Sequence, residues 1–229
     1  MVLKDKVVVI TGGSKGFGKA LAEAFIREGA KVSICSPNKK ELSKTAEEIG
    51  ALGIVADVRD ESEMKALATK TIEKYDAINI WVNNAGIWLP HKNAEDFDMD
   101  EVKEMFDINV FGLMNGSRVA LRYMKEKGDG TIINIISAAA LDGRKGISTY
   151  AASKWAVNGF TKSIREENKD KGISILSVFP GGMKTEIFNK GKPDNFKDFM
   201  DPKDIAEKVV ANIKLENPEA ELIIKRENR

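Results

Sequence analysis

The chain has 229 residues, and its 36 basic and 35 acidic side chains give a formal net charge of +1. This balance excludes the strongly basic surface that a nucleic-acid or anionic-membrane partner requires. Charged residues at 31% and apolar residues at 42% are typical of a globular protein and exclude a disordered or membrane-spanning chain. The single cysteine, Cys35, cannot form an intrachain disulfide. Because the N-terminal residues do not resemble an export signal, we expect a cytoplasmic location.

Short apolar strands alternate with amphipathic helical segments along the chain. The first strand, 6–10, is a β-branched run followed by glycines, which is typical of a strand buried on both faces. Apolar residues then recur at helical spacing, at Phe17, Leu21 and Phe25, and Gly29 ends that helix. In chain order we expect strands at 6–10, 31–35, 53–58, 78–82, 131–136, 173–179 and 222–224, and helices at 16–28, 39–49, 62–74, within 100–127, within 152–169 and at 202–214.

This alternation predicts an α/β fold of the Rossmann type, a doubly wound seven-stranded parallel sheet flanked by helices on both faces. No proline- or glycine-rich linker interrupts it, so we expect residues 1–229 to form a single domain. One segment, 186–200, does not fit the alternation, because Pro193 stands there among phenylalanines and charged residues. Its length favours either a substrate lid or a surface connection.

A glycine cluster, Thr11-Gly-Gly-Ser-Lys-Gly-Phe-Gly18, follows the first strand. Glycine permits positive φ and a close approach of backbone amides to a pyrophosphate, while a helix N-terminus supplies partial positive charge. A glycine cluster alone is a weak signal, but its place between a strand and a helix predicts a dinucleotide site. The cofactor-binding residues expected in this glycine loop are Gly12, Ser14, Lys15, Gly16, Phe17 and Gly18.

The end of the second strand indicates which dinucleotide binds. An acidic residue there would bind the ribose hydroxyls of NAD and repel the phosphate of NADP. Here the strand ends in Cys-Ser-Pro-Asn-Lys-Lys, and no carboxylate occurs before Glu41. Ser36 and Asn38 offer hydrogen-bond donors, and Lys39, together with Lys15, offers positive charge. We therefore predict NADP(H) rather than NAD(H), although each lysine alone also fits a solvated surface position.

Several further motifs extend this pattern along the chain. In order, the motifs are Thr11-Gly-x-x-x-Gly-x-Gly18, Asp57-Val58, Asn83-Asn-Ala-Gly86, Asn109, Ser137, Tyr150-Ala-Ala-Ser-Lys154 and Pro180-Gly181. In this combination the chain resembles the short-chain dehydrogenase/reductase family in its compact form. The resemblance implies an NAD(P)-dependent oxidoreductase that transfers a hydride between NADP(H) and a carbonyl or alcohol substrate. In that family a basic residue at the position of Lys15 goes with NADP, whereas the family's arginine after the second strand is absent here, near Pro37.

The resemblance also implies which residues bind the rest of the cofactor. We expect Asp57, with Val58, at the adenine, Asn84, Ala85 and Gly86 along the adenosine ribose side, and Pro180, Gly181 and Thr185 at the nicotinamide end. Tyr150 and Lys154 belong to the same set. The alternative for the Asn83-Asn-Ala-Gly86 motif is a plain turn from a strand to a helix.

The catalytic chemistry is expected from Tyr150 and Lys154, which are four residues apart in a helical segment and so share a face. A lysine ammonium about 4 Å away would lower the tyrosine pKa from about 10 toward 7. Tyr150 is thus the predicted general acid in reduction and general base in oxidation. Ser137 ends the fifth strand, where its hydroxyl can polarise a substrate carbonyl. The resemblance implies that Asn109 orders a water that relays protons through Lys154.

The residues expected around the substrate are mostly apolar, namely Ile87, Trp88, Ala139, Ile147 and Met183, with Ser137. They favour a small or medium carbonyl compound of hydrophobic character, although Arg144 and Lys184 could bind an acidic group. No metal site is expected, because the chain has one cysteine and one histidine. A serine–histidine hydrolase would depend on His91 alone, for which a surface role is favoured.

Two further expectations concern assembly and a competing function. The resemblance implies a homodimer or a homotetramer. The alternative function is a dinucleotide-binding sensor or scaffold with the same fold and little turnover. The combination of Tyr150, Lys154 and Ser137 argues against that alternative, because a protein without turnover has no physical need for all three.

Overall fold

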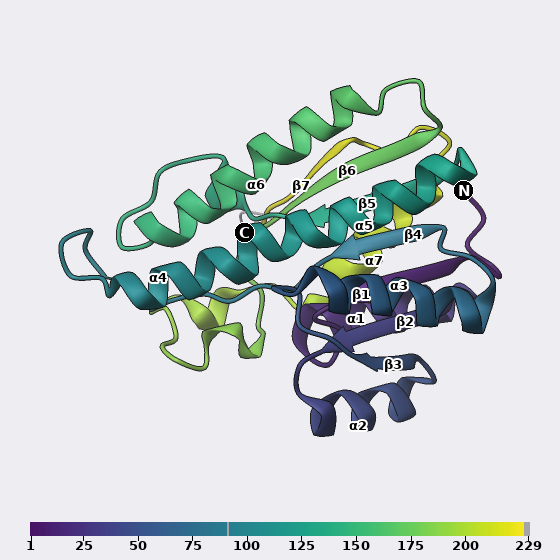
Figure 1. Cartoon of the computed structure of the whole chain (residues 1–229). Helices are drawn as coiled ribbons and strands as arrows, with labels where there is room; N and C mark the ends of the chain where they lie inside the picture. The colour runs from purple at the N-terminus through teal and green to yellow at the C-terminus, as the bar shows by residue number, and fades with distance from the viewer. Residues whose placement is uncertain (91, 227–229) are drawn as a thin grey trace.

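Seven parallel strands form one sheet in the order β3-β2-β1-β4-β5-β6-β7 (Figure 1). The computed structural model describes residues 1–90 and 92–226, so that His91 lies outside the described residues. The strands are β1 Val7–Thr11, β2 Lys31–Ser36, β3 Leu52–Val55, β4 Ile80–Asn83, β5 Gly130–Ile135, β6 Ile173–Pro180 and β7 Glu221–Ile224. The chain reverses its direction across the sheet between β3 and β4, which confirms the predicted doubly wound fold.

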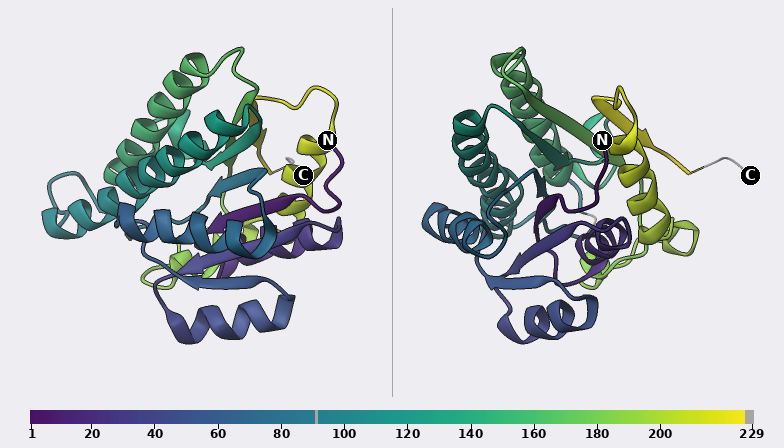
Figure 2. Two further views of the ribbon diagram at one scale, coloured as in Figure 1. Left: turned by 45° about the vertical axis from the view of Figure 1, so that its right-hand side comes forward. Right: turned by 90° about the vertical axis from the view of Figure 1, so that its right-hand side faces the viewer.

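Helices cover both faces of this sheet. They are α1 Gly16–Arg27, α2 Lys39–Ile49, α3 Glu61–Tyr75, α4 Met99–Phe106, α5 Gly112–Lys127, α6 Ser148–Glu167 and α7 Pro202–Lys214. Helices α1, α2 and α7 pack on one face and α3, α5 and α6 on the other, as the right-hand view of Figure 2 shows. Along β1, Val8 and Ile10 belong to the first core and Val9 to the second, because successive side chains alternate between faces. Among the described residues, no helix is long and apolar enough to cross a membrane.

The helix expected within 100–127 is interrupted. Helices α4 and α5 are joined by one π-helical turn, Asp107–Phe111. Such a turn inserts a residue into the helical repeat and redirects the side chains that follow, and it is frequent at functional sites. The turn contains Asn109, which is buried. The hydrophobic period alone cannot reveal this insertion, because the apolar face continues on both sides of it.

Two other boundaries affect the position of functional residues. Helix α6 begins at Ser148, earlier than the predicted 152, so Tyr150 lies in its first turn. Strand β5 ends at Ile135, which corrects the expectation that Ser137 ends the fifth strand. Ser137 instead precedes the short 3₁₀ turn Ala138–Ala140, and its hydroxyl accepts a hydrogen bond from the Ala139 amide at 3.1 Å.

The segment 186–200 crosses the carboxyl end of the sheet, in light green below α4 in Figure 1. It contains two short 3₁₀ turns, Glu186–Phe188 and Phe196–Asp198. The ring of Phe188 meets the rings of Trp88 and Phe199 edge-on, at centroid distances of 5.0 and 5.3 Å. Edge-to-face contacts of this kind stabilise a packed arrangement. The segment is therefore held to the loop after β4 by aromatic contacts.

Candidate active site

A cavity of about 1080 Å³ opens at the carboxyl end of the sheet. Its walls come from the glycine loop, the turns after β2, β3 and β4, the residues after β5, helix α6 and the segment after β6. All of the predicted site residues line it except Lys39 and Asn109. Lys39 is exposed at the start of α2, whereas Asn109 is buried behind the cavity wall. The volume is at the upper end of the range of small-molecule sites.

The glycine loop is shaped for close approach of a ligand to the backbone. Gly12 has a φ of +65°, and a Cβ on Gly18 would lie 2.2 Å from the Gly12 carbonyl oxygen, so neither position accepts a side chain without a shift of the backbone. Helix α1 has no acidic residue in its first turn, and its N-cap residue, Lys15, makes no side-chain cap. The first amides of the helix therefore remain available to an anion, which fits the pyrophosphate of a dinucleotide.

The turn after β4 is bonded to this loop. The Asn84 side chain donates hydrogen bonds to the carbonyl oxygens of Thr11 and Gly12, at 2.9 and 3.2 Å. The Thr11 hydroxyl accepts from the amides of Asn84 and Ala85, at 3.0 and 3.1 Å. These bonds fix the distance between the two strands at which the sheet order reverses. They give the Asn83-Asn-Ala-Gly86 motif a role in building the cavity floor.

A buried polar network supports the turn from below. The Asn83 amide donates to the Ser117 hydroxyl at 2.9 Å and to the Asn134 amide oxygen at 2.8 Å. Asn134 in turn donates to Thr161 of α6 at 2.9 Å. A Cβ on Gly116 would lie 2.2 Å from the Asn83 oxygen, so α5 approaches closely only because this residue is glycine. The network connects β4, β5, α5 and α6, the helix that carries Tyr150 and Lys154.

In the turn after β3, Asp57 is paired with Arg59, a residue that the sequence analysis did not single out. The Arg59 guanidinium contacts both carboxylate oxygens of Asp57, at 3.1 Å from Nε to Oδ1 and 2.6 Å from Nη2 to Oδ2. Hydrogen bonding from Arg59 holds the pKa of Asp57 below its ordinary value. Arg59 also lines the cavity. Asp57 is thus held as an oriented acceptor.

Glu41 is a second cavity residue that the sequence analysis did not name as a site residue. The Ser14 hydroxyl donates to its carboxylate at 3.0 Å, and the Lys15 ammonium lies 3.4 Å from the same group. Ser36 and Asn38 line the cavity beside it. The linear sequence gives no signal for this contact, because Glu41 follows the end of β2 by a full helical turn.

The candidate catalytic groups converge on one wall. Lys154 is buried, and its ammonium donates to the Ile135 carbonyl oxygen at 3.3 Å and lies 5.7 Å from the Tyr150 ring centroid. Burial raises the pKa of Tyr150 to about 12, while a hydrogen bond with Ser137 acts in the opposite direction. Burial lowers the pKa of Lys154 to about 8. Both pKa shifts are opposite to those expected for a phenolate paired with an ammonium. The reason is that removal from water disfavours the charged form of each group.

Asn109 reaches the loop after β4 rather than the cavity itself. Its side-chain oxygen accepts from the Ile87 amide at 2.8 Å, and its nitrogen donates to the Ile87 carbonyl at 2.9 Å. A Cβ on Gly86 would lie 3.2 Å from the Asn109 oxygen and 3.8 Å from the Lys154 nitrogen. Asn109 therefore fixes the loop beside the lysine.

The apolar residues that were expected around the substrate belong to the cavity wall. Ile87, Trp88, Ala139, Ile147 and Met183 all line it. Of the two basic residues considered for an acidic group, Arg144 lines the cavity, but Lys184 is exposed and does not.

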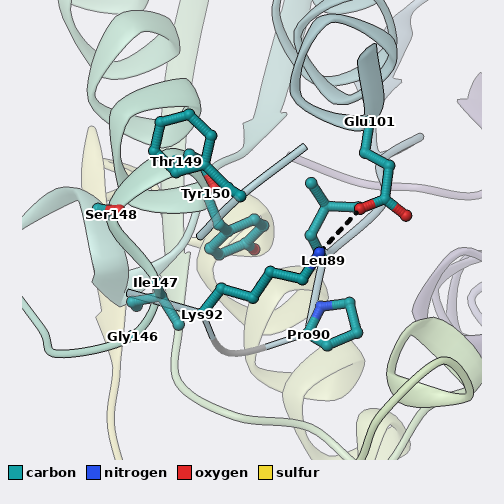
Figure 3. A pocket seen from close by; sticks show the side chains of 10 residues that line it. Leu89, Pro90, Lys92, Glu101, Gly146, Ile147, Ser148, Thr149 and Tyr150 are labelled. Atoms are coloured by element: carbon teal, nitrogen blue, oxygen red, sulfur yellow. Dashed lines mark hydrogen bonds and ion pairs between the residues drawn. The ribbon is translucent and has the colours of Figure 1, made fainter. Parts of the chain in front are cut away.

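A small side pocket adjoins this wall. Figure 3 shows Tyr150 in it, with Lys92 directed toward Glu101 of α4. Their charged groups are 3.4 Å apart. This ion pair joins the loop after β4 to α4, and the Lys92 amide also donates to the Gly146 carbonyl at 3.1 Å.

Comparisons with known proteins agree with this geometry. A sequence profile of the family described as short chain dehydrogenase matches residues 6–195. The chain is 33% identical over 194 residues to a 3alpha-hydroxysteroid dehydrogenase of Mediterraneibacter gnavus, a match covering 82% of this chain and 77% of the relative. It is 32% identical over 212 residues to an uncharacterized oxidoreductase of Staphylococcus aureus, covering 91% of both chains.

Solved structures show the same arrangement. The 3-ketoacyl-(acyl-carrier-protein) reductase of Brucella melitensis, complexed with NADH, is 28% identical with a TM-score of 0.91, covering 97% of each chain. The alcohol dehydrogenase of Thermococcus sibiricus, complexed with 5-hydroxy-NADP, is 26% identical with a TM-score of 0.87, covering 98% of this chain and 99% of that one.

Proposed function

The chain belongs to the short-chain dehydrogenase/reductase family, and from that premise we propose that it transfers a hydride between NADP(H) and a carbonyl or alcohol substrate. One observation carries the proposal. Tyr150, Lys154 and Ser137 line the same cavity as a glycine loop that fits a pyrophosphate. When bound, the dinucleotide supplies the hydride chemistry. The chain's own residues orient the substrate and move the proton.

Tyr150 is the proposed proton donor to the substrate oxygen. With a pKa near 12, its phenol is protonated at neutral pH and can give a proton during reduction. Ser137, hydrogen-bonded to Tyr150, would donate to the same oxygen and position it. In the oxidation direction Tyr150 takes the proton back from the alcohol.

Lys154 is proposed to stabilise the phenolate that Tyr150 leaves behind. Its pKa of about 8 keeps most of the ammonium charged at neutral pH, and its nitrogen lies on the same wall as the phenol. An ammonium in a partly desolvated site attracts an anion more strongly than it would in water. Asn109, which holds the adjacent loop, is proposed to order the water that returns a proton through Lys154.

The NADP(H) preference is also a proposal. Its support is that β2 ends without a carboxylate and that Lys15, Ser14 and Ser36 line the adenosine end of the cavity. Similar structures hold either NADH or 5-hydroxy-NADP, so the likeness alone favours neither cofactor. Titration with NADPH and NADH, followed by reduced-nicotinamide fluorescence, tests it. Tighter binding of NADH would overturn the preference.

For the substrate we propose a small or medium carbonyl compound with a hydrophobic part, covered by the segment 186–200 as a lid. The apolar lining and the Trp88–Phe188 contact support this class. The test is NADPH oxidation with aldehydes, ketones, ketosteroids and 3-oxoacyl thioesters, and NADP+ reduction with hydroxysteroids. Turnover of at least one class, lost in Tyr150→Phe, is expected. No turnover with either cofactor would contradict the proposed reaction and favour a binding role.

We also propose a homodimer or a homotetramer. An apolar groove between α5 and α6 contains Met114, Leu121 and Phe160, and Trp155 of α6 is 50% exposed. Exposed apolar side chains that gather on one face are a common feature of interfaces. Size-exclusion chromatography with light scattering is expected to give a multiple of 25.2 kDa, and a monomer at working concentration would reject the proposal.

A further inference from the structure

The Glu41 carboxylate lies at the adenosine end of the cavity, against the two glycine-loop side chains that offer donors there. The Ser14 hydroxyl donates to Oε2 at 3.0 Å, and the Lys15 ammonium is 3.4 Å from the carboxylate. Ser14 is almost fully buried, whereas the side chains of Lys15 and Glu41 are 57% and 35% exposed. The positive charge of Lys15 is thus balanced by a negative charge inside the same cavity.

The hydrogen bonds at the start of α2 explain why the Glu41 side chain points toward the glycine loop. Asn38 is the N-cap of α2 and accepts from the Glu41 amide at 3.1 Å. In a capping box the glutamate three residues after the cap would accept in return from the cap amide. Here the Asn38 amide donates to the Ser36 hydroxyl at 3.3 Å instead. The Glu41 carboxylate therefore does not accept a hydrogen bond from the Asn38 amide, and it contacts the glycine loop instead.

Packing fixes the distance between α2 and the glycine loop. The Thr45 hydroxyl, one turn further along α2, donates to the Ser14 carbonyl at 2.7 Å, and this bond is buried. Leu42 between them belongs to the core. The backbones of α2 and the glycine loop are thus held close together, which keeps the Glu41 carboxylate within reach of Ser14 and Lys15. A ligand that uses these two donors must displace the carboxylate.

We propose that Glu41 is a specificity-determining residue that opposes binding of the ribose phosphate of NADP(H). This inference rests on the proposed dinucleotide site. A phosphate monoester carries about −1.5 to −2 charges at neutral pH and needs the donors that Glu41 engages. An unphosphorylated ribose brings no such charge and meets no such repulsion. Glu41 thus reduces the difference between the affinities for NADP(H) and NAD(H) that Lys15 alone would produce.

The test is Glu41→Gln, with NADPH and NADH dissociation constants measured by reduced-nicotinamide fluorescence. The amide keeps the size of the side chain and an acceptor for Ser14, but removes the charge. The NADPH dissociation constant is expected to fall about threefold to tenfold, and that of NADH to change by less than about twofold. Glu48→Gln is the matched control, because Glu48 is on the same helix and pairs with Lys19 at 2.7 Å outside the cavity lining.

A second pair of variants tests whether the gain acts through Lys15. In the double variant Lys15→Met/Glu41→Gln the gain in NADPH affinity is expected to disappear, since the released ammonium is then missing. If the Tm of Glu41→Gln is markedly lower than that of the wild type, Glu41→Lys is measured in its place. A larger gain in NADPH affinity is then expected.

Two results would overturn the inference alone. One is an unchanged ratio of the two dissociation constants in Glu41→Gln, and the other is weakened NADH binding, which would make Glu41 a ligand of the ribose hydroxyls. Wild-type protein that binds neither cofactor would instead remove the proposed function, and this inference with it.

Discussion

The ammonium nitrogen of Lys154 lies 5.7 Å from the ring centroid of Tyr150, one turn earlier on α6. The same nitrogen donates to the Ile135 carbonyl oxygen, which ties the helix to the end of β5. Burial favours the neutral form of each group and so shifts their pKa values in opposite directions, to about 12 for the phenol and about 8 for the ammonium. Near neutral pH the Tyr150 phenol therefore keeps its proton, whereas the Lys154 ammonium can lose and regain one.

Removal of the phenol hydroxyl tests the proton donor. Tyr150→Phe is expected to lower kcat for carbonyl reduction by about 10²- to 10⁴-fold, the range of a single general acid. Cofactor affinity should change little, because the ring remains. Tyr123→Phe is the control, since Tyr123 packs on α5 beside Lys127 and outside the cavity. The measurement is steady-state kinetics with the best substrate of the panel. A kcat in Tyr150→Phe close to that of the wild type would reject the mechanism.

The pH dependence of reduction reports on Lys154. Its pKa is about 8, so the ammonium is present below that pH and lost above it. The value of kcat/KM for reduction is therefore expected to be level up to about pH 8 and to fall at higher pH. An arginine stays charged throughout this range. In Lys154→Arg, the kcat/KM of any residual activity should not decrease above about pH 8. If the decrease remains in this variant, Lys154 is not the group that causes it.

Gly18 tests the shape of the glycine loop. A Cβ in Gly18→Ala would lie 2.2 Å from the Gly12 carbonyl oxygen, a backbone atom that can yield only by moving the loop. We expect loss of measurable cofactor binding together with a lower Tm. Gly159→Ala on α6 is the control, because a Cβ there has nothing within 4 Å. That change should stabilise the helix by about 0.5–1 kcal/mol. Cofactor affinity preserved in Gly18→Ala would contradict the assigned role of the loop.

The aromatic contacts of the segment 186–200 test the proposed lid. Phe188→Ala removes the edge contacts to Trp88 and Phe199, each worth about 0.5–1.5 kcal/mol beyond the buried area. KM for the substrate is expected to rise more than the dissociation constant of the cofactor. Phe188→Tyr keeps the ring and should remain near wild type. Equal kinetics in both variants would show that the segment is a surface connection.

Cys35 supplies a test of the core that does not depend on activity. The thiol is fully buried in β2, and burial raises its pKa to about 12. Since the thiolate is the reactive form, a thiol reagent at about pH 8 is expected to modify the folded protein very slowly. In denaturant one thiol per chain should react at once. Fast modification of the folded protein would show that β2 opens readily to solvent.

Local patterns in the sequence were enough to predict the fold and about half of the residues that line the cavity. The alternation of buried strands with amphipathic helices requires crossover connections, which the sheet order confirms. The glycine loop and the spacing of Tyr150 and Lys154 are local too, because one turn of helix brings such residues to the same face. All but two of the predicted site residues line one cavity, since the carboxyl ends of parallel strands meet at one edge.

Tertiary structure alone decided how these groups act on one another. Asn109 lies in a π-helical turn that the apolar period conceals, and Glu41 turns to the glycine loop because Ser36 satisfies the Asn38 amide in its place. The spacing of Tyr150 and Lys154 in the sequence predicts that they are adjacent and attract each other, but it does not predict their burial. Desolvation depends on the atoms that strands and helices from distant parts of the chain pack around a group. The sequence by itself therefore determined which residue types line the candidate site, and the packed structure determined in which direction the pKa values of Tyr150 and Lys154 shift.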